Sequence, residues 1–242
     1  MKNLNNAISK IAKTDRTQEK QFHGLIIIDK VMTFIPSWPL IVHLLSGFVC
    51  MGLSATFHLM WITNRTVQDW LSRFDYAGIC ILIMGSSYPP IFYAFSCGPI
   101  LLSRNIFLAI ISTTSTLSLI VMVAPSMQEN KYRTFRALLF IFLGLSAGIP
   151  FIYMNLTQND EVPHYLPSKD GTPWLVGGLV YIAGALNYAF RFPEKFYPFK
   201  FDIIGASHQI FHVAVLFGFG IMFKDSIRLY NESQSFVCPI VV

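Results

Sequence analysis

Six long apolar stretches constrain this chain of 242 residues more than any other feature. They lie at about 38–62, 76–96, 104–124, 134–156, 173–190 and 204–223. A helix needs about 20 mainly apolar residues to cross the roughly 30 Å hydrocarbon core of a bilayer. Backbone groups in lipid must bond within their own segment, so each stretch is predicted to be helical. The sequence therefore predicts an all-α polytopic membrane protein with six transmembrane helices.

Composition and charge exclude the common soluble classes. Charged residues make up 13% of the chain and hydrophobic residues 53%, whereas a globular protein carries about 25% charged residues. The net charge is +5, but the basic residues form no continuous stripe, so we expect no nucleic-acid partner. The four cysteines imply no disulfide framework. We divide the chain into a polar, basic N-terminal tail with a short interfacial segment (1–36), a transmembrane helical domain (37–223) and a C-terminal tail (224–242).

The basic residues in the connections predict how the spans are oriented, because cytoplasmic loops carry an excess of Lys and Arg. The second and fourth loops and the C-terminal tail together hold four basic residues. The first, third and fifth loops hold eight: Arg65, Arg73, Lys131, Arg133, Arg136, Arg191, Lys195 and Lys200. The odd loops are therefore predicted to be cytoplasmic and the C-terminus extracytoplasmic. Six spans would then leave the basic N-terminal tail outside, so we expect the chain to be one helix short.

Ionisable side chains inside the spans indicate a functional site, because an Asp at the bilayer centre costs about 2.5–3.5 kcal/mol on insertion scales. His208 and His212 are four residues apart in the last span, on one face of a helix. His58 lies near the end of the first span and Asp75 at the start of the second. Because the spans alternate in direction, these residues fall on the same side of the membrane, at a similar depth of about 5–12 Å below the cytoplasmic boundary. We expect them to form one cluster.

Three neutral imidazoles with an open fourth position are typical of a catalytic zinc site, in which the metal lowers the pKa of its water to about 7. We therefore predict that His58, His208 and His212 are the ligands of a Zn²⁺ ion. Asp75 is predicted to be catalytic, as an acceptor for that water or as a general base, and Ser54 is predicted to hold the water or an imidazole. An alternative is that Asp75 merely caps the second span.

Three motifs, taken together, resemble a known family. They are Ser54-Ala-Thr-Phe-His58, then Asp75-Tyr-Ala-Gly78 followed by Ile83-Met-Gly-Ser86, and finally Phe190-Arg-Phe-Pro-Glu-Lys-Phe-Tyr-Pro-Phe-Lys-Phe-Asp202 leading into Ser207-His-Gln-Ile-Phe-His212. In this order they resemble the progestin and adipoQ receptor family, which also includes the hemolysin III proteins. The similarity covers residues 37–223, and the last motif is most similar to the adiponectin-receptor branch.

The resemblance implies a bundle of seven helices with a cytoplasmic N-terminus and an intramembrane Zn²⁺. It implies that His58, His208 and His212 are the metal ligands, while Asp75 and Ser54 contact the metal-bound water. It also implies a receptor or a lipid hydrolase, since adiponectin receptors are linked to hydrolysis of ceramide amides by zinc-bound hydroxide. The family's first helix finds no match in this chain, which agrees with the distribution of charge.

Two functions remain open at this point. One is a zinc-dependent amidohydrolase that acts on a ceramide-like membrane lipid, and the other is a receptor for an extracellular ligand in which the zinc is structural. A third hypothesis is haem binding through His43 and His58, which are fifteen residues or roughly 22 Å apart along a helix. It is disfavoured because no other helix carries a histidine pair at a similar separation, and His43 is expected to make an interhelical hydrogen bond instead.

Overall fold

The computed structural model describes residues 35–60, 64–97, 100–157, 171–201 and 203–235. Its helices are α2 (Trp38–Leu59), α3 (Arg65–Ala94), α4 (Leu101–Val123), α5 (Arg133–Ser146), α6 (Ile149–Thr157), α7 (Thr172–Phe190) and α8 (Ser207–Ser235). They form six spans that are long and apolar enough to cross a membrane, with α5 and α6 sharing one span. No strand occurs in these ranges. The prediction of an all-α, multi-pass membrane protein is confirmed, while the N-terminal tail with its expected interfacial segment (1–36) lies almost wholly outside the described residues.

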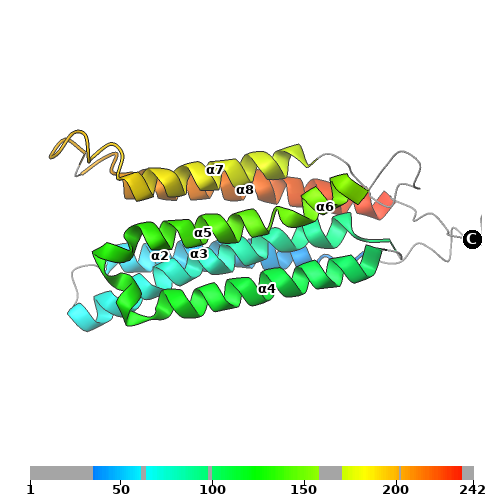
Figure 1. The fold of residues 1–242 in the computed structure, drawn as a ribbon, viewed down its shortest axis with the longest axis horizontal. Helices are drawn as coiled ribbons and strands as arrows, with labels where there is room; N and C mark the ends of the chain where they lie inside the picture. The colour runs from blue at the N-terminus through cyan, green and yellow to red at the C-terminus, as the bar shows by residue number, and fades with distance from the viewer. Residues whose placement is uncertain (1–34, 61–63, 98–99, 158–170, 202, 236–242) are drawn as a thin grey trace, which may run out of the picture.

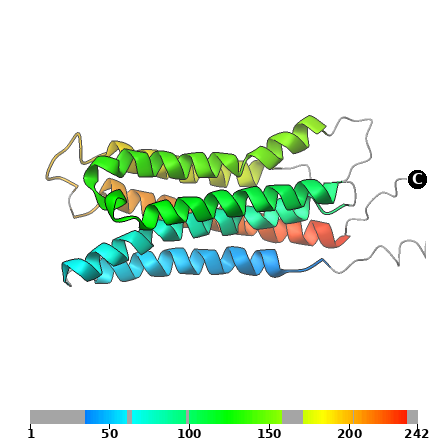
Figure 2. The ribbon, with the colours of Figure 1, turned by 60° about the horizontal axis from the view of Figure 1, so that its bottom comes forward.

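The spans run back and forth along one axis, so that the connections alternate between the two ends of the bundle (Figure 1). The loops from α2 to α3, from α4 to α5 and from α7 to α8 all lie at the same end (Figures 1 and 2). These are the three connections rich in basic residues. Along the sides of the bundle, large apolar side chains such as Phe48, Leu117, Phe142 and Phe217 are exposed, as expected for helices whose outer faces meet lipid.

Small residues let α2 and α3 pack closely side by side. Ser46, Cys50 and Ser54 are buried and follow one another at intervals of four residues along α2. A Cβ atom added at Gly85 of α3 would collide with the side chain of Ser46, and one added at Gly78 would lie 3.1 Å from the Cα atom of Cys50. Stripes of small residues of this kind allow the backbones of two membrane helices to approach each other closely. The approach holds the central part of α2 against the central part of α3.

The second span begins earlier than its hydropathy predicts. Helix α3 starts at Arg65, and the side chain of Asn64 caps it by accepting a hydrogen bond of 2.9 Å from the backbone N–H of Val67. Asp75 therefore lies ten residues inside the helix and is buried. The alternative in which Asp75 serves as a helix cap is wrong, because Asn64 already fills that position.

The fourth span is broken between α5 and α6. Residues 147 and 148 form a turn, and Pro150 occupies the second position of α6. Proline has no N–H and therefore cannot donate to the carbonyl of Ser146, four residues earlier, which ends the first helix. The predicted single helix at 134–156 is thus two helices joined at an angle, which Figure 2 shows where the green ribbon bends.

The last helix continues well beyond its apolar stretch. It was expected to end at 223, but α8 runs to Ser235. Asp225 is buried and pairs with Arg228 at 2.7 Å, and Arg228 also reaches Glu232 at 3.1 Å. Because each charge has an opposite partner one turn away, the helix carries them without leaving an unpaired ion among the packed helices.

His43 makes the interhelical contact that was expected of it. Its ring is fully buried, and Nδ1 lies 3.0 Å from the hydroxyl oxygen of Ser226 on α8. Phe219 and Phe223 contact the ring edge to face. Within the described part of the chain, no second imidazole faces His43, so the arrangement does not favour a haem at this position.

We predict that Gly85→Val destabilises the bundle by about 1–3 kcal/mol, because the new side chain must force α2 and α3 apart. The expected result is a lower midpoint temperature for loss of the monodisperse peak when the detergent-solubilised protein is heated. Gly52→Val is the matched control, since nothing lies within 4 Å of a Cβ atom added at Gly52 on α2. Equal midpoints for the two variants would contradict the proposed close packing.

Candidate metal centre

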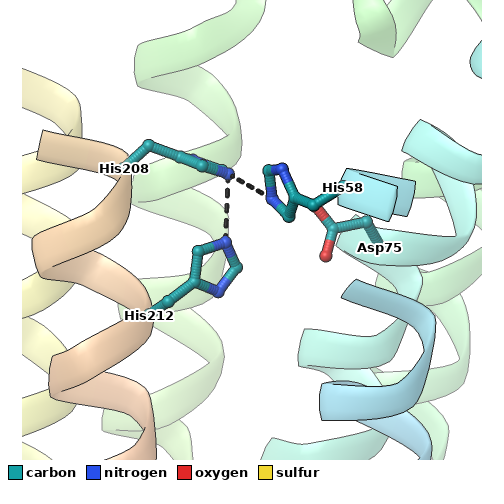
Figure 3. Close-up of side chains that lie close together, drawn as sticks. All are labelled: His58, Asp75, His208 and His212. Atoms are coloured by element: carbon teal, nitrogen blue, oxygen red, sulfur yellow. Dashed lines mark hydrogen bonds between the residues drawn. The ribbon is translucent and has the colours of Figure 1, made fainter. Parts of the chain in front are cut away.

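Four residues predicted to form a cluster come together at the end of the bundle that carries the basic loops. His58 lies one residue before the end of α2, Asp75 on α3, and His208 and His212 in the first two turns of α8. One ligating atom of each lies within 4.8 Å of the others. Figure 3 shows the three imidazoles and the carboxylate pointing toward a common centre. The structure thus brings together residues that are up to 154 positions apart in the sequence.

The geometry of the imidazole nitrogens fits a shared metal ion. Nε2 of His208 lies 3.2 Å from Nε2 of His58 and 3.0 Å from Nε2 of His212. The nitrogen–nitrogen edge of a tetrahedral zinc site is about 3.3 Å, because Zn–N bonds measure about 2.0–2.1 Å. Each neutral imidazole has one N–H and one lone pair, so several lone pairs facing one point favour a cation between them. Histidine nitrogens with a carboxylate are a donor set that suits zinc and other divalent transition metals.

Ser54 lies beside this cluster. Its hydroxyl oxygen is 3.5 Å from both ring nitrogens of His212, which is the upper limit of a hydrogen bond. The side chain is buried and also lies next to the Asp75 carboxylate. Ser54 is therefore close enough to contact a small ligand at the centre, and its catalytic role stays a prediction.

Sequence reasoning missed a polar network behind the cluster. The hydroxyl groups of Tyr76 and Tyr188 are 3.1 Å apart, and Nη2 of Arg136 donates to the Tyr188 hydroxyl at 3.4 Å. Arg133 donates to the Tyr188 backbone carbonyl at 3.0 and 2.7 Å and stacks over the Tyr188 ring, which in turn lies 5.6 Å from the His208 ring between centroids.

The positions of Tyr76, Arg136 and Tyr188 in the apolar stretches are a sequence signal for this network. Tyr76 follows Asp75, Arg136 opens the fourth apolar stretch and Tyr188 closes the fifth, so the alternation of the spans places all three near the level of the histidines. Arg136 was assigned to a loop by its charge, yet it is almost fully buried. Its guanidinium also donates to the backbone carbonyls of Met127 and Glu129, which explains how a cation is tolerated there.

The loop before α8 fixes the start of that helix. The Glu194 carboxylate accepts hydrogen bonds from the backbone N–H of Ser207, at 2.8 Å, and from the Ser207 hydroxyl. Burial raises the pKa of Glu194, but the bonds from Ser207 outweigh this effect and hold the pKa below its usual range. A carboxylate at a helix N-terminus is also stabilised by the helix dipole. His208 follows Ser207 directly, so Glu194 determines where the first histidine of α8 lies.

A large apolar cavity begins within one helical turn of the cluster. It has a volume of about 660 Å³ and lies between α3, α5, α6, α7 and α8. Ile79, four residues after Asp75, and Phe211, whose ring lies 5.7 Å from that of His212, both line it. Leu145, Ile152, Leu175 and Leu179 also line it and are more than half exposed on the outside of the bundle. The cavity therefore extends from the neighbours of the cluster toward the lipid-facing surface between α5–α6 and α7, and its lining does not include the four cluster residues themselves.

Trp174 belongs to this cavity and not to the membrane interface. A tryptophan near a span end is typical of the membrane interface, but Trp174 is buried, and its ring stacks on that of Phe151 with centroids 4.3 Å apart. Both rings line the cavity. A position near a span end therefore does not by itself make a tryptophan interfacial, because the side chain can face the inside of the bundle.

Comparison with known proteins identifies the family. The family model for Haemolysin-III related proteins matches residues 19–223. A rice protein, heptahelical transmembrane protein ADIPOR2, is 36% identical over 184 residues, which is 76% of this chain and 78% of the relative. Heptahelical transmembrane protein 3 from Arabidopsis thaliana is 36% identical over 76% of this chain and 52% of its own length. The adiponectin receptor protein of Drosophila melanogaster is 38% identical over 71% of this chain and 38% of its own length.

The chain spans about half the length of several of the curated relatives it matches. Their names count seven helices, and six spans lie in the part of this chain that the structure describes. The matched region contains all four residues of the cluster. On the family model and on relatives above 30% identity, the chain belongs to the haemolysin-III-related family of progestin and adipoQ receptors.

Proposed function

We propose that this protein is a zinc-dependent intramembrane hydrolase of lipid amides, with a ceramide-like lipid as its substrate. The observation that supports the proposal is a metal-competent cluster at the end of an apolar cavity that is open to lipid. Pockets for small molecules have volumes of about 300–1,000 Å³, and the cavity of about 660 Å³ falls within this range. The lining is mainly aliphatic and aromatic, as required for the hydrocarbon chain of a lipid.

His58, His208 and His212 would hold the metal in this proposal. A zinc ion supplies Lewis acidity that polarises a carbonyl group and makes water a stronger acid. The buried Asp75 carboxylate lies beside the imidazoles and the Ser54 hydroxyl, where it would be placed to accept a proton from an attacking water. As the carbon–oxygen bond forms and the carbon–nitrogen bond breaks, Asp75 returns that proton to the departing amine. Ser54 would orient the water or the His212 ring.

The network of Tyr76, Tyr188 and Arg136 would orient the polar end of the lipid. Two hydroxyl groups and a buried guanidinium stand next to the cluster and can bond the hydroxyl or amide groups of a sphingoid base. The described residues that line the cavity include no charged residue, so a substrate with its chain in the cavity would meet a charged group only at the metal end, which favours one orientation of the lipid.

The alternative is a receptor without catalysis. The three histidines come from α2 and α8, and a metal held by them would link two helices from opposite ends of the described chain. This arrangement would also suit a structural zinc, and one relative is named an adiponectin receptor. Both functions require the same ligands, so the experiments below separate metal binding from hydrolysis.

Purified protein is expected to contain about one zinc ion per chain, and the double variant His208→Ala, His212→Ala is expected to lose it, because one histidine is too few for a stable site. Elemental analysis of the detergent-solubilised proteins measures this. His43→Gln is the matched control, since His43 is buried in the same bundle but bonds to Ser226. Well-folded wild type without metal would refute both proposed functions.

Asp75→Asn is expected to retain zinc and to lower hydrolysis of a fluorescent ceramide by about 10²–10⁴-fold, because the amide cannot accept the proton of water. The release of fatty acid or of the labelled base gives the rate, and zinc content is measured on the same sample. If zinc-loaded wild type hydrolyses no more ceramide than the double histidine variant, the hydrolase is excluded and the receptor with structural zinc is favoured.

Glu194→Ala is expected to weaken zinc binding by about tenfold, a typical effect of removing a group that orients a ligand. The reason is that the start of α8, and with it His208, loses both hydrogen bonds to the carboxylate. Competition with a fluorescent zinc chelator gives the dissociation constant. Glu129→Ala is the control, because Glu129 lies in another loop at the same end and pairs with Lys131 instead. Equal dissociation constants for the two variants would contradict this role of Glu194.

A further inference from the structure

The loop between α7 and α8, residues 191–206, exposes an unusual number of large apolar side chains. Phe199 is 90% exposed, Ile203 84% and Phe196 65%, and Phe192 and Tyr197 are about half exposed. The loop continues directly from Phe190, which is 64% exposed at the end of α7. Water is a poor environment for so many neighbouring apolar groups, so this surface requires a partner.

The loop is folded and holds these side chains outward. Lys195, Phe196 and Tyr197 donate backbone hydrogen bonds to the carbonyls of Arg191 and Pro193 at 2.8, 2.9 and 3.1 Å. Pro193 is buried and Glu194 is turned toward Ser207, so the inner side of the loop is committed to the bundle. Figure 1 shows the loop projecting past the ends of α7 and α8, away from the other helices.

Cations alternate with the aromatic residues on the outer side. Arg191, Lys195 and Lys200 are all exposed. Glu194 bonds Ser207, and Asp202, the other acidic residue of the loop sequence, lies outside the described residues. Tryptophan, tyrosine and phenylalanine next to Lys and Arg are typical of segments that lie in the headgroup layer, where the rings meet the upper acyl chains and the cations meet phosphate.

The position of the loop indicates that its partner is the lipid membrane. Its two ends are the ends of membrane spans, so it lies where the bundle leaves the hydrocarbon core. On α3, at the same end, Trp70 and Phe74 are exposed and Arg73 stacks over Trp70 at 4.6 Å. The same combination of aromatic and basic side chains thus occurs on two sides of the bundle at one level, as expected for a surface surrounded by lipid headgroups.

We propose that the α7–α8 loop is an anchor that binds anionic phospholipid headgroups in the leaflet nearest to the metal centre. Lys195 and Lys200 contact the lipid phosphates and carboxylates, and Phe196, Phe199 and Ile203 enter the upper part of the acyl-chain region. The anchor depends only on the membrane position of the bundle and is independent of whether the protein is a hydrolase.

A tryptophan at position 199 tests the anchor. The variant Phe199→Trp, in the full chain, is placed in nanodiscs of phosphatidylcholine and phosphatidylserine in which only one of the two lipids carries bromine near the top of its acyl chains. Bromine quenches tryptophan on contact, and subtraction of the unsubstituted protein removes the native signal. We expect strong quenching, with a preference for phosphatidylserine over phosphatidylcholine of about fivefold per lysine. Adding Lys195→Gln and Lys200→Gln is expected to lower the preference by about fivefold for each lysine removed and to leave the quenching by phosphatidylcholine.

Phe142→Trp is the matched control, because Phe142 is 71% exposed on α5 and has no basic neighbour in its helical turn. It should be quenched by both lipids without preference. Absence of quenching at position 199 by either lipid would show that the loop stands in water and would overturn the proposal. Equal quenching by the two lipids at position 199 would overturn the anionic specificity.

Discussion

The convergence of His58, Asp75, His208 and His212 sets the arrangement of three helices in this bundle. Polar groups inside a membrane protein are costly unless they find partners, and these four face a single point. Close packing makes the convergence precise. Small residues bring α2 against α3, and the gap between α7 and α8 is equally narrow, since a Cβ atom added at Gly184 of α7 would meet that of Ala214 at 2.7 Å. The positions of these four residues therefore depend on close helix contacts along α2, α3, α7 and α8.

The sequence predicted the spans and the cluster because both follow from periodic or compositional rules. A run of apolar residues specifies a span, and the alternation of spans places His58, Asp75 and the histidines of α8 at one level. It did not predict where α3 begins, because hydropathy ignores Asn64 and the polar turns that follow it. It did not predict the length of α8 either, because Asp225 and Arg228 neutralise each other only once the helix has formed.

The cavity and the network around Tyr188 could not be derived from the sequence, since each is a property of several helices at once. The turn at residues 147–148 bends the fourth span, and five helices then leave space between them. Trp174 and Arg136 both contradict simple rules, one as a buried tryptophan near a span end and the other as a buried cation. Tertiary contacts satisfy each of them. Trp174 lines the cavity, and Arg136 belongs to the network around Tyr188. Both exceptions therefore lie where a ligand would bind.

The positions of the three histidines along the chain have a consequence for biosynthesis. His58 is made early, whereas His208 and His212 lie on α8, the last helix of the described chain. Chains are synthesised from the N-terminus at about 5–20 residues per second, so the ligand set exists only after five spans have already been translated. The three histidines could therefore bind one metal ion only after α8 has been inserted beside α2. A chain released before residue 207 would carry only one histidine of the three.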